Sequence, residues 1–208
     1  MRTVGSHVID RFDGWISGLG TTSGRRIVVG HWPDTPLGSF TDVMTESADG
    51  HRTLLAPSEE VAAFVAATYT FDEVRIVPVT HTAHDDRRRV VAGPVQVSWR
   101  VGGRPPLGRL LRAVPGALAV HPWWLRAIDP FARRVLPGVR TVGTAGNGRR
   151  EYYGARDLHR VLAASARWDD GDCGALAPVA PPVRFGFGSA PATPSHVRIT
   201  TLVERSLT

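Results

Sequence analysis

Residues 39–56 read SFTDVMTESADGHRTLLA, and this stretch decides the fold. Two strand-like runs, 39–47 and 51–56, flank the dipeptide Asp49-Gly50. An Asp-Gly pair between two such runs is typical of a tight β-hairpin turn, because glycine tolerates a positive φ. The stretch therefore predicts an antiparallel hairpin.

Segments on both sides of this hairpin continue the β pattern. On the N-terminal side, 14–19 (GWISGL) and 26–32 (RIVVGHW) predict two strands. On the C-terminal side, strands are predicted at 71–80, 90–101 and 196–203. Within these, Pro78 indicates an edge strand or a bulge, and Gly93-Pro94 indicates a kink.

Short helices are inserted between the strands. Ser58 is a favourable N-cap, and acidic residues follow it in the first turn, where the helix dipole favours anions. Residues 107–114 and 123–136 predict two more helices, broken by Pro115 and Pro130.

The whole chain, 1–208, is predicted to form a single domain. Its 208 residues are 42% hydrophobic, which is enough for a full core, and no internal repeat or boundary is evident. Residues 157–168 fit a helix by their alanines and a strand by their alternation. A meander of strands with inserted short helices predicts an α+β fold, either an antiparallel β-barrel or a cone-like sheet.

The basic residues exclude several kinds of chemistry. All 25 are arginine and the net charge is +6. Without lysine, the chain has no P-loop lysine, no Schiff-base lysine and no anchor for pyridoxal phosphate. Arginine-mediated nucleic-acid binding is an alternative function, but the arginines are scattered and only 87–89 form a run, which fits a solvated hairpin tip.

The remaining composition bears on the cellular setting. No apolar stretch has the length of a signal peptide or a transmembrane helix, so no membrane partner is predicted. The single cysteine, Cys173, cannot form an intramolecular disulfide, and a reducing cytoplasmic setting is the default. Both a monomer and a homo-oligomer stay open.

A glycine cluster, Gly143–Gly148, is the most conspicuous local motif. Glycine-rich loops can cradle phosphates, and Arg149 and Arg150 follow this one. The spacing is G-x-x-G-x-G instead of the dinucleotide fingerprint, so a tight structural turn and an anion-binding loop are both open. Asn147, Arg150 and His159 belong to the densest polar group, which also contains Glu151 and Asp157.

No cofactor and no metal are predicted. His81 and His84 lie close together beside two aspartates, but no second cluster completes a metal site. Cys173 in a turn is typical of an inert thiol.

Residues 36–42 (PLGSFTD) resemble the G-P-Y-x-E motif that begins a strand in acetoacetate decarboxylase-like proteins, and 54–79 resemble the segment that follows it. The resemblance covers residues 26–100, which is under half the chain. It implies a β-barrel or cone-like antiparallel sheet around a central ligand cavity.

The departures from this family limit the chemistry. The family's Schiff-base lysine falls at Asp72 or Glu73, and its strand glutamate matches Asp42. The resemblance therefore places Asp42, Asp72 and Glu73 near the site while excluding decarboxylation through an imine.

These observations predict a pocketed protein that binds, or acts on, a small anionic organic molecule. Catalytic candidates are Asp42, Asp72, Glu73 and His159; ligand-binding candidates are Arg26, His31, Asn147 and Arg150. A non-catalytic protein-interaction module is the other alternative, since no complete catalytic motif is evident.

Overall fold

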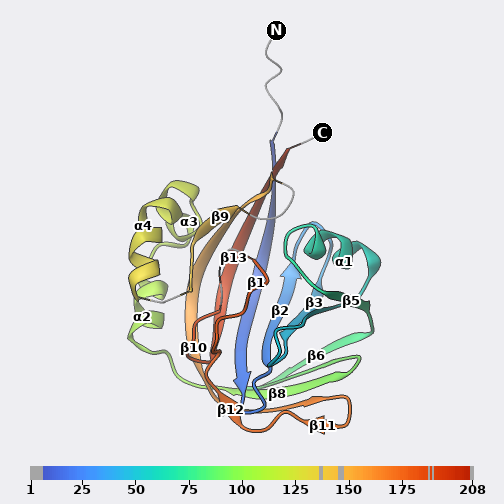
Figure 1. Cartoon of the computed structure of the whole chain (residues 1–208). Coiled ribbons are helices and arrows are strands. Elements are labelled where there is room, and N and C mark those ends of the chain that lie inside the picture. Colours follow the sequence, from blue (N-terminus) through green and yellow to red (C-terminus); the bar gives the residue numbers. More distant parts are fainter. Residues whose placement is uncertain (1–6, 136–137, 145–147, 187, 189, 207–208) are drawn as a thin grey trace.

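The computed structural model describes residues 7–135, 138–144, 148–186, 188 and 190–206 (Figure 1). The strands are β1 (His7–Thr21), β2 (Arg26–Asp34), β3 (Phe40–Glu46), β4 (Arg52–Ala56), β5 (Glu73–Ile76), β6 (Val79–His84), β7 (Arg87–Ala92), β8 (Val95–Val101), β9 (Val142–Thr144), β10 (Arg150–Trp168), β11 (Gly171–Asp172), β12 (Leu176–Ala177) and β13 (Ser195–Ser206). The helices are α1 (Glu59–Ala66), α2 (Pro106–Ala113), α3 (Gly116–Ala119) and α4 (Pro122–Val135).

All these strands join one curled sheet. The order is β5-β4-β3-β2-β1-β13-β10-β8-β7-β6, with β9 and β11 paired to β10, and β12 paired to β1. Every described pair is antiparallel except β4 and β5, which are joined through α1. The predicted α+β fold with a largely antiparallel sheet and short helices is confirmed.

The sheet is open, so the cone-like alternative holds and the closed barrel does not. Within the described residues, β5 and β6 are the two edges and do not pair with each other. They are nevertheless consecutive in sequence, and only Val77 and Pro78 separate them. Proline lacks an N–H donor for a strand ladder, which explains why the run predicted at 71–80 splits here into two edge strands.

The hairpin at 39–56 forms as predicted, and Gly50 at its turn has a φ of 92°. The run predicted at 90–101 is instead a second hairpin, because Gly93 turns the chain with a φ of 52°. The arginine run does not form the tip of the β6–β7 hairpin; Asp85, with a φ of 50°, stands there.

The helical predictions need one correction. Ser58 caps α1, since its hydroxyl accepts a hydrogen bond from the amide of Val61 at 3.3 Å. Pro115 precedes α3, but Pro130 lies inside α4 and does not break it. The ambiguous segment 157–168 belongs to β10 and pairs with β8 and β13.

Two flanks of the sheet carry helices. Figure 1 shows α1 beside β2 and β3, and α2–α4 on the opposite flank beside β9 and β10. The alternation of side chains along β2 and β3 divides the interior: Val29 and Val43 join one apolar cluster, while Val28 and Met44 join another on the opposite face.

Gly108 sets the distance between α2 and the sheet. A Cβ added there would lie 2.1 Å from the backbone oxygen of Leu158 on β10. We expect Gly108→Ala to lower the free energy of unfolding by about 1–3 kcal/mol, although alanine is the better helix former. Urea unfolding measures this loss. Gly103→Ala is the control, because no atom lies within 4 Å of its added Cβ; equal stabilities for the two variants would contradict the expectation.

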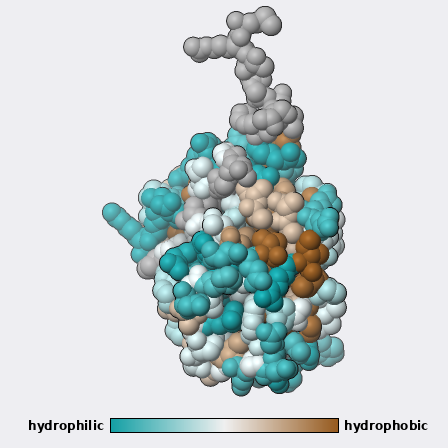
Figure 2. Space-filling model, turned by 45° about the vertical axis from the view of Figure 1, so that its right-hand side comes forward, coloured by the Kyte–Doolittle hydropathy of each residue, from teal (hydrophilic) through white to brown (hydrophobic). Residues whose placement is uncertain are grey.

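The described surface exposes few large hydrophobic side chains, and they are Ile9, Val74, Ile76, Leu110, Trp123, Phe131 and Leu162. Figure 2 shows a largely hydrophilic face on which hydrophobic side chains gather in one patch. Among the described helices, none combines the length and the apolar character needed to cross a bilayer.

Candidate ligand cavity

A cavity of about 470 Å³ lies between the sheet and the helices. Its walls come from β1–β3, β10, β13, α1, α2, α4 and the described residues 183, 185, 186, 188, 190 and 191. Aromatic side chains contribute much of the lining, and they are Phe12, Trp32, Phe40, Phe64, Tyr69, Trp124, Phe131, Tyr153 and Phe185. A largely apolar cavity with few polar groups is typical of small-molecule sites.

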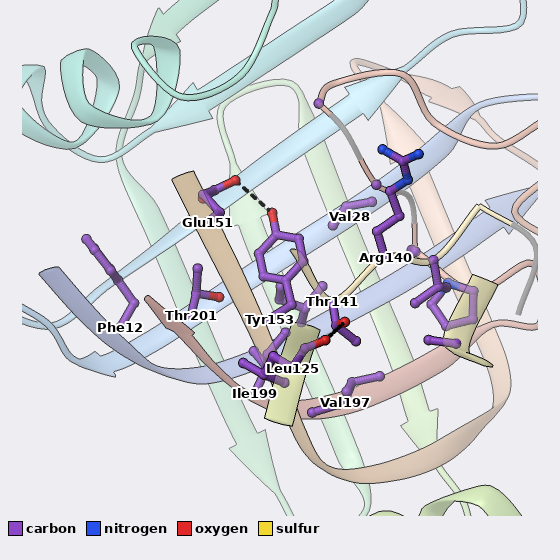
Figure 3. A pocket seen from close by; sticks show the side chains of 18 of the residues that line it. Phe12, Val28, Leu125, Arg140, Thr141, Glu151, Tyr153, Val197, Ile199 and Thr201 are labelled. Carbon is purple, nitrogen blue, oxygen red and sulfur yellow. Dashed lines mark hydrogen bonds between the residues drawn. The ribbon is translucent and has the colours of Figure 1, made fainter. Parts of the chain in front are cut away.

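The most elaborate polar group in this lining joins Glu151 to two tyrosines. The hydroxyl of Tyr69 donates to Oε1 of Glu151 at 3.0 Å. The hydroxyl of Tyr153 donates to Oε2 at 3.2 Å (Figure 3). The two tyrosine oxygens are 2.5 Å apart. Glu151 and Tyr153 stand two residues apart on β10, so they project to the same face of the sheet.

Burial changes the acidity of this group. Glu151 is 1% exposed, and desolvation raises the pKa of its carboxyl to about 7, with the tyrosine hydrogen bonds opposing part of the shift. Desolvation and the neighbouring carboxylate raise the pKa of Tyr69 and of Tyr153 well above the ordinary value. Glu151 is therefore the group in this cluster that exchanges its proton near neutral pH.

Asp42 is a second buried carboxyl in the same lining. Its Oδ1 accepts a hydrogen bond from the indole Nε1 of Trp32 at 3.0 Å. Desolvation raises its pKa to about 7, and this hydrogen bond only partly offsets the effect. Gly30 makes room for the pair, because a Cβ there would lie 2.4 Å from the same indole nitrogen and 2.5 Å from Oδ1.

Arg140 is the one lining residue with a permanent positive charge among those the structure describes. It is half-buried, stands among the side chains around the cavity in Figure 3, and forms no hydrogen bond or ion pair with another described residue. Its neighbour Thr141 is fixed by hydrogen bonds to the backbone oxygen of Leu125 at 2.6 Å and to Asp129 at 3.2 Å. The guanidinium is thus free to pair with an anion.

Of the residues predicted from sequence, only Asp42 lines this cavity. Asp72 lies at the surface, where the guanidinium and amide of Arg52 lower the pKa of its carboxyl. Glu73 pairs with Arg75 at 2.8 Å, which lowers its pKa as well. Both acidic groups are therefore separate from Asp42.

The predicted ligand-binding residues are dispersed. Arg26 is buried in an ion pair with Glu46 at 2.9 Å, and Arg150 is exposed at the start of β10. His31 faces a separate, smaller cavity. Asn147 lies outside the described residues, as do 145 and 146 of the glycine cluster, whereas Gly143 belongs to β9.

His159, the remaining catalytic candidate, also lies away from the lining. Its Nδ1 is 2.9 Å from the backbone oxygen of Gly102, and its Nε2 is 3.4 Å from Asp157. Asp157 is itself held by Arg104 at 2.8 Å. These contacts orient the imidazole of His159, but they place it in contact with neither Asp42 nor Glu151.

The sequence interpretation missed Tyr69, Tyr153 and Arg140; it placed Glu151 in a polar group suited to acid–base chemistry but did not choose it as a catalytic candidate. One signal was available: Glu151 and Tyr153 alternate, as two residues on one face of a strand do. Tyr69 gave none, because it meets Glu151 across 82 positions of the chain.

The comparisons with known proteins give a similarity among solved structures. No family model matches the sequence, and no curated protein does. Among solved structures, the chain is similar to acetoacetate decarboxylase from Legionella pneumophila, with 10% sequence identity and a TM-score of 0.45. The match covers 100% of this chain and 91% of the other. The match does not bear on a ligand or a reaction.

Proposed function

We propose that this protein binds a small, largely apolar organic acid in the cavity between the sheet and the helices. The observation that supports this proposal is an apolar cavity of about 470 Å³ whose lining includes a half-buried arginine with no described partner. Pockets of this size and composition bury most of a small ligand's surface, and a few polar groups fix its orientation.

Arg140 is the proposed partner of the ligand's carboxylate. A guanidinium offers two parallel N–H donors to a carboxylate, and such charge-assisted bonds are among the strongest in proteins. The aromatic walls would cover the apolar part of the ligand. Asp42 and Glu151 would not repel it below about pH 7, because their raised pKa values keep them largely protonated there.

Proton-transfer catalysis is the second candidate function. Asp42 and Glu151 both have a pKa of about 7, which suits a general acid or base at neutral pH. The reaction would not pass through an imine, since the chain contains no lysine. Either carboxyl would exchange a proton with a hydroxyl or a carbon adjacent to a carbonyl group of the bound molecule.

A matched series of ligands tests the binding proposal. Octanoate, octanol and octylamine share one apolar chain and differ in the head group. At pH 6 we expect octanoate to raise the melting temperature most, by about 5–10 °C at one hundred times its dissociation constant. The shift is expected to shrink at pH 8, where both carboxyls ionise and repel the ligand.

Two leucine variants on one strand locate the binding site. Ala155 lines the cavity, whereas Ala163 lies exposed further along β10. Ala155→Leu is expected to lower the apparent affinity for octanoate, derived from the melting-temperature shifts, at least tenfold. Ala163→Leu is expected to leave that affinity unchanged. No shift with any of the three ligands, a preference for octylamine, or equal effects of the two variants would each contradict the proposal.

A further inference from the structure

A second cavity, of about 200 Å³, lies on the other face of the sheet and shares no lining residue with the first. The β6–β7 hairpin closes over β1 and β2 there, and β8 and β13 complete the wall. Its lining residues with polar groups are Trp15, Ser17, His31, His81, Arg88, Trp99 and His196. Three imidazoles, one guanidinium and two indoles in so small a space form a dense set of N–H groups.

Hydrogen bonds at Nδ1 orient two of the imidazoles. Nδ1 of His31 is 2.8 Å from the hydroxyl of Thr41, and Nδ1 of His196 is 2.7 Å from the hydroxyl of Ser17. When each hydroxyl donates to Nδ1, the neutral ring carries its proton on Nε2. Ring contacts hold the geometry, because His81 packs on His31 at 4.0 Å and Trp15 stacks on His196 at 4.5 Å.

Arg88 and Trp99 add donors that lack partners. Nη1 of Arg88 donates to the backbone oxygens of Asp85 at 2.8 Å and Arg87 at 2.9 Å, which fixes the guanidinium at the end of the hairpin. Its Nε and Nη2 form no bond with another described residue. Trp99 is 4% exposed, and its buried Nε1 has no partner among the described residues. An unpaired buried N–H group is costly, so this arrangement favours an acceptor from outside the chain.

The charges around the cavity are all of one sign. Burial lowers the pKa of His31, His81 and His196, and the positive charge of Arg88 lowers all three further. His159 on β10 also acts on His196. Among the described lining residues there is no carboxylate, and Asp157, which pairs with His159, is also held by Arg104. Within the described residues, no set of three side chains is arranged to hold a metal ion.

We propose that this second cavity is a binding site for a small oxyanion, a carboxylate or a phosphate group. Arg88 is its ion-pair partner, and the imidazoles and the indole of Trp99 are its hydrogen-bond donors. An anion brings the negative charge and the acceptor atoms that the described lining lacks. The site does not depend on the function proposed for the larger cavity, because the two share no residue.

Acetate and inorganic phosphate are the probes. The indole N–H resonances of the protein labelled with ¹⁵N are followed by NMR at constant ionic strength, and Trp99→Phe assigns the signal of that residue. We expect acetate, phosphate or both to shift the Trp99 signal saturably, with a midpoint below about 10 mM. The titration that saturates, with acetate or with phosphate, identifies the class of anion that the site binds. No saturable shift with either anion, or a saturable shift with equimolar Zn²⁺ alone, would overturn the proposal.

The arginine run supplies a matched pair of variants. Arg88→Gln is expected to weaken binding at least tenfold, whereas Arg87→Gln, which removes the same charge from an exposed neighbour, is expected to change it less than twofold. If Arg88→Gln does not fold, His81→Gln on the edge strand is expected to weaken binding at least threefold. Equal losses in Arg87→Gln and Arg88→Gln would show nonspecific attraction and refute the site.

Discussion

Replacing Glu46 with alanine is expected to cost about 3–5 kcal/mol of unfolding free energy, because it leaves the buried charge of Arg26 without a partner. The ion pair is 2.9 Å long, and the two side chains are 3% and 1% exposed. Arg26 would keep one hydrogen bond, from Nη2 to the backbone oxygen of Ser47. Glu46 also accepts hydrogen bonds from the backbone amide and the guanidinium of Arg184, so the substitution would loosen the chain at Arg184, whose neighbours Val183 and Phe185 line the first cavity.

Urea unfolding at pH 7 measures this loss, and two comparisons interpret it. Glu73→Ala removes an ion-paired glutamate at the surface and is expected to cost far less, since solvent screens exposed pairs. The double variant Arg26→Met/Glu46→Leu removes both charges and is expected to recover much of the stability that Glu46→Ala loses. A double variant as unstable as the single one would show that the buried charge is not the cause.

Asp42→Asn is expected to stabilise the protein at pH 8, by up to about 3–4 kcal/mol. The pKa of Asp42 is about 7 in the folded protein, against an ordinary value of 3.8 for an exposed aspartate. The folded state thus holds a proton that the unfolded chain has released. The stability that this group contributes is complete below pH 3.8 and is lost as the pH rises through about 7. Asparagine does not titrate, and its amide oxygen can still accept the Trp32 hydrogen bond.

The measurement is the difference in unfolding free energy between Asp42→Asn and the parent protein at pH 5 and at pH 8. The difference is expected to grow with pH, while the similar titration of Glu151 affects both proteins and cancels. Asp72→Asn is the control with the opposite sign: its carboxyl has a lowered pKa, so its contribution is present above the unfolded pKa and is removed by the substitution. A constant difference for Asp42→Asn would contradict the raised pKa.

Local signals in the sequence were sufficient to predict most strands and helices. Asp49-Gly50 marks a turn, and Ser58 marks a helix start, because each works through its own backbone and nearest neighbours. The errors arose where two such signals compete. Pro78 was interpreted as an edge strand or a bulge, and the edge is correct, but the single strand predicted at 71–80 is divided there into β5 and β6. Pro130 stays within α4 because packing on the sheet overrides the loss of one helical hydrogen bond.

The candidate site was less predictable, because its contacts span the chain. Asp42 was identified through a family resemblance, and the structure places it in the cavity lining. Tyr69 and Tyr153 meet across 84 positions, and no local pattern brings them together. Arg26 was wrongly interpreted as a ligand-binding residue. Its guanidinium pairs with the carboxylate of Glu46 from the same chain, and a sequence pattern does not reveal that partner.

The pairing of β1 with β13 has a consequence for synthesis on the ribosome. These strands lie side by side in the middle of the sheet, and Ser17 meets His196 across 179 positions of the chain. At about 5–20 residues per second, β1 waits roughly 10–35 s for its central partner to be translated. Throughout that time one side of β1 is an unpaired edge open to other chains, which makes the nascent protein a natural client for chaperones that shield exposed strands.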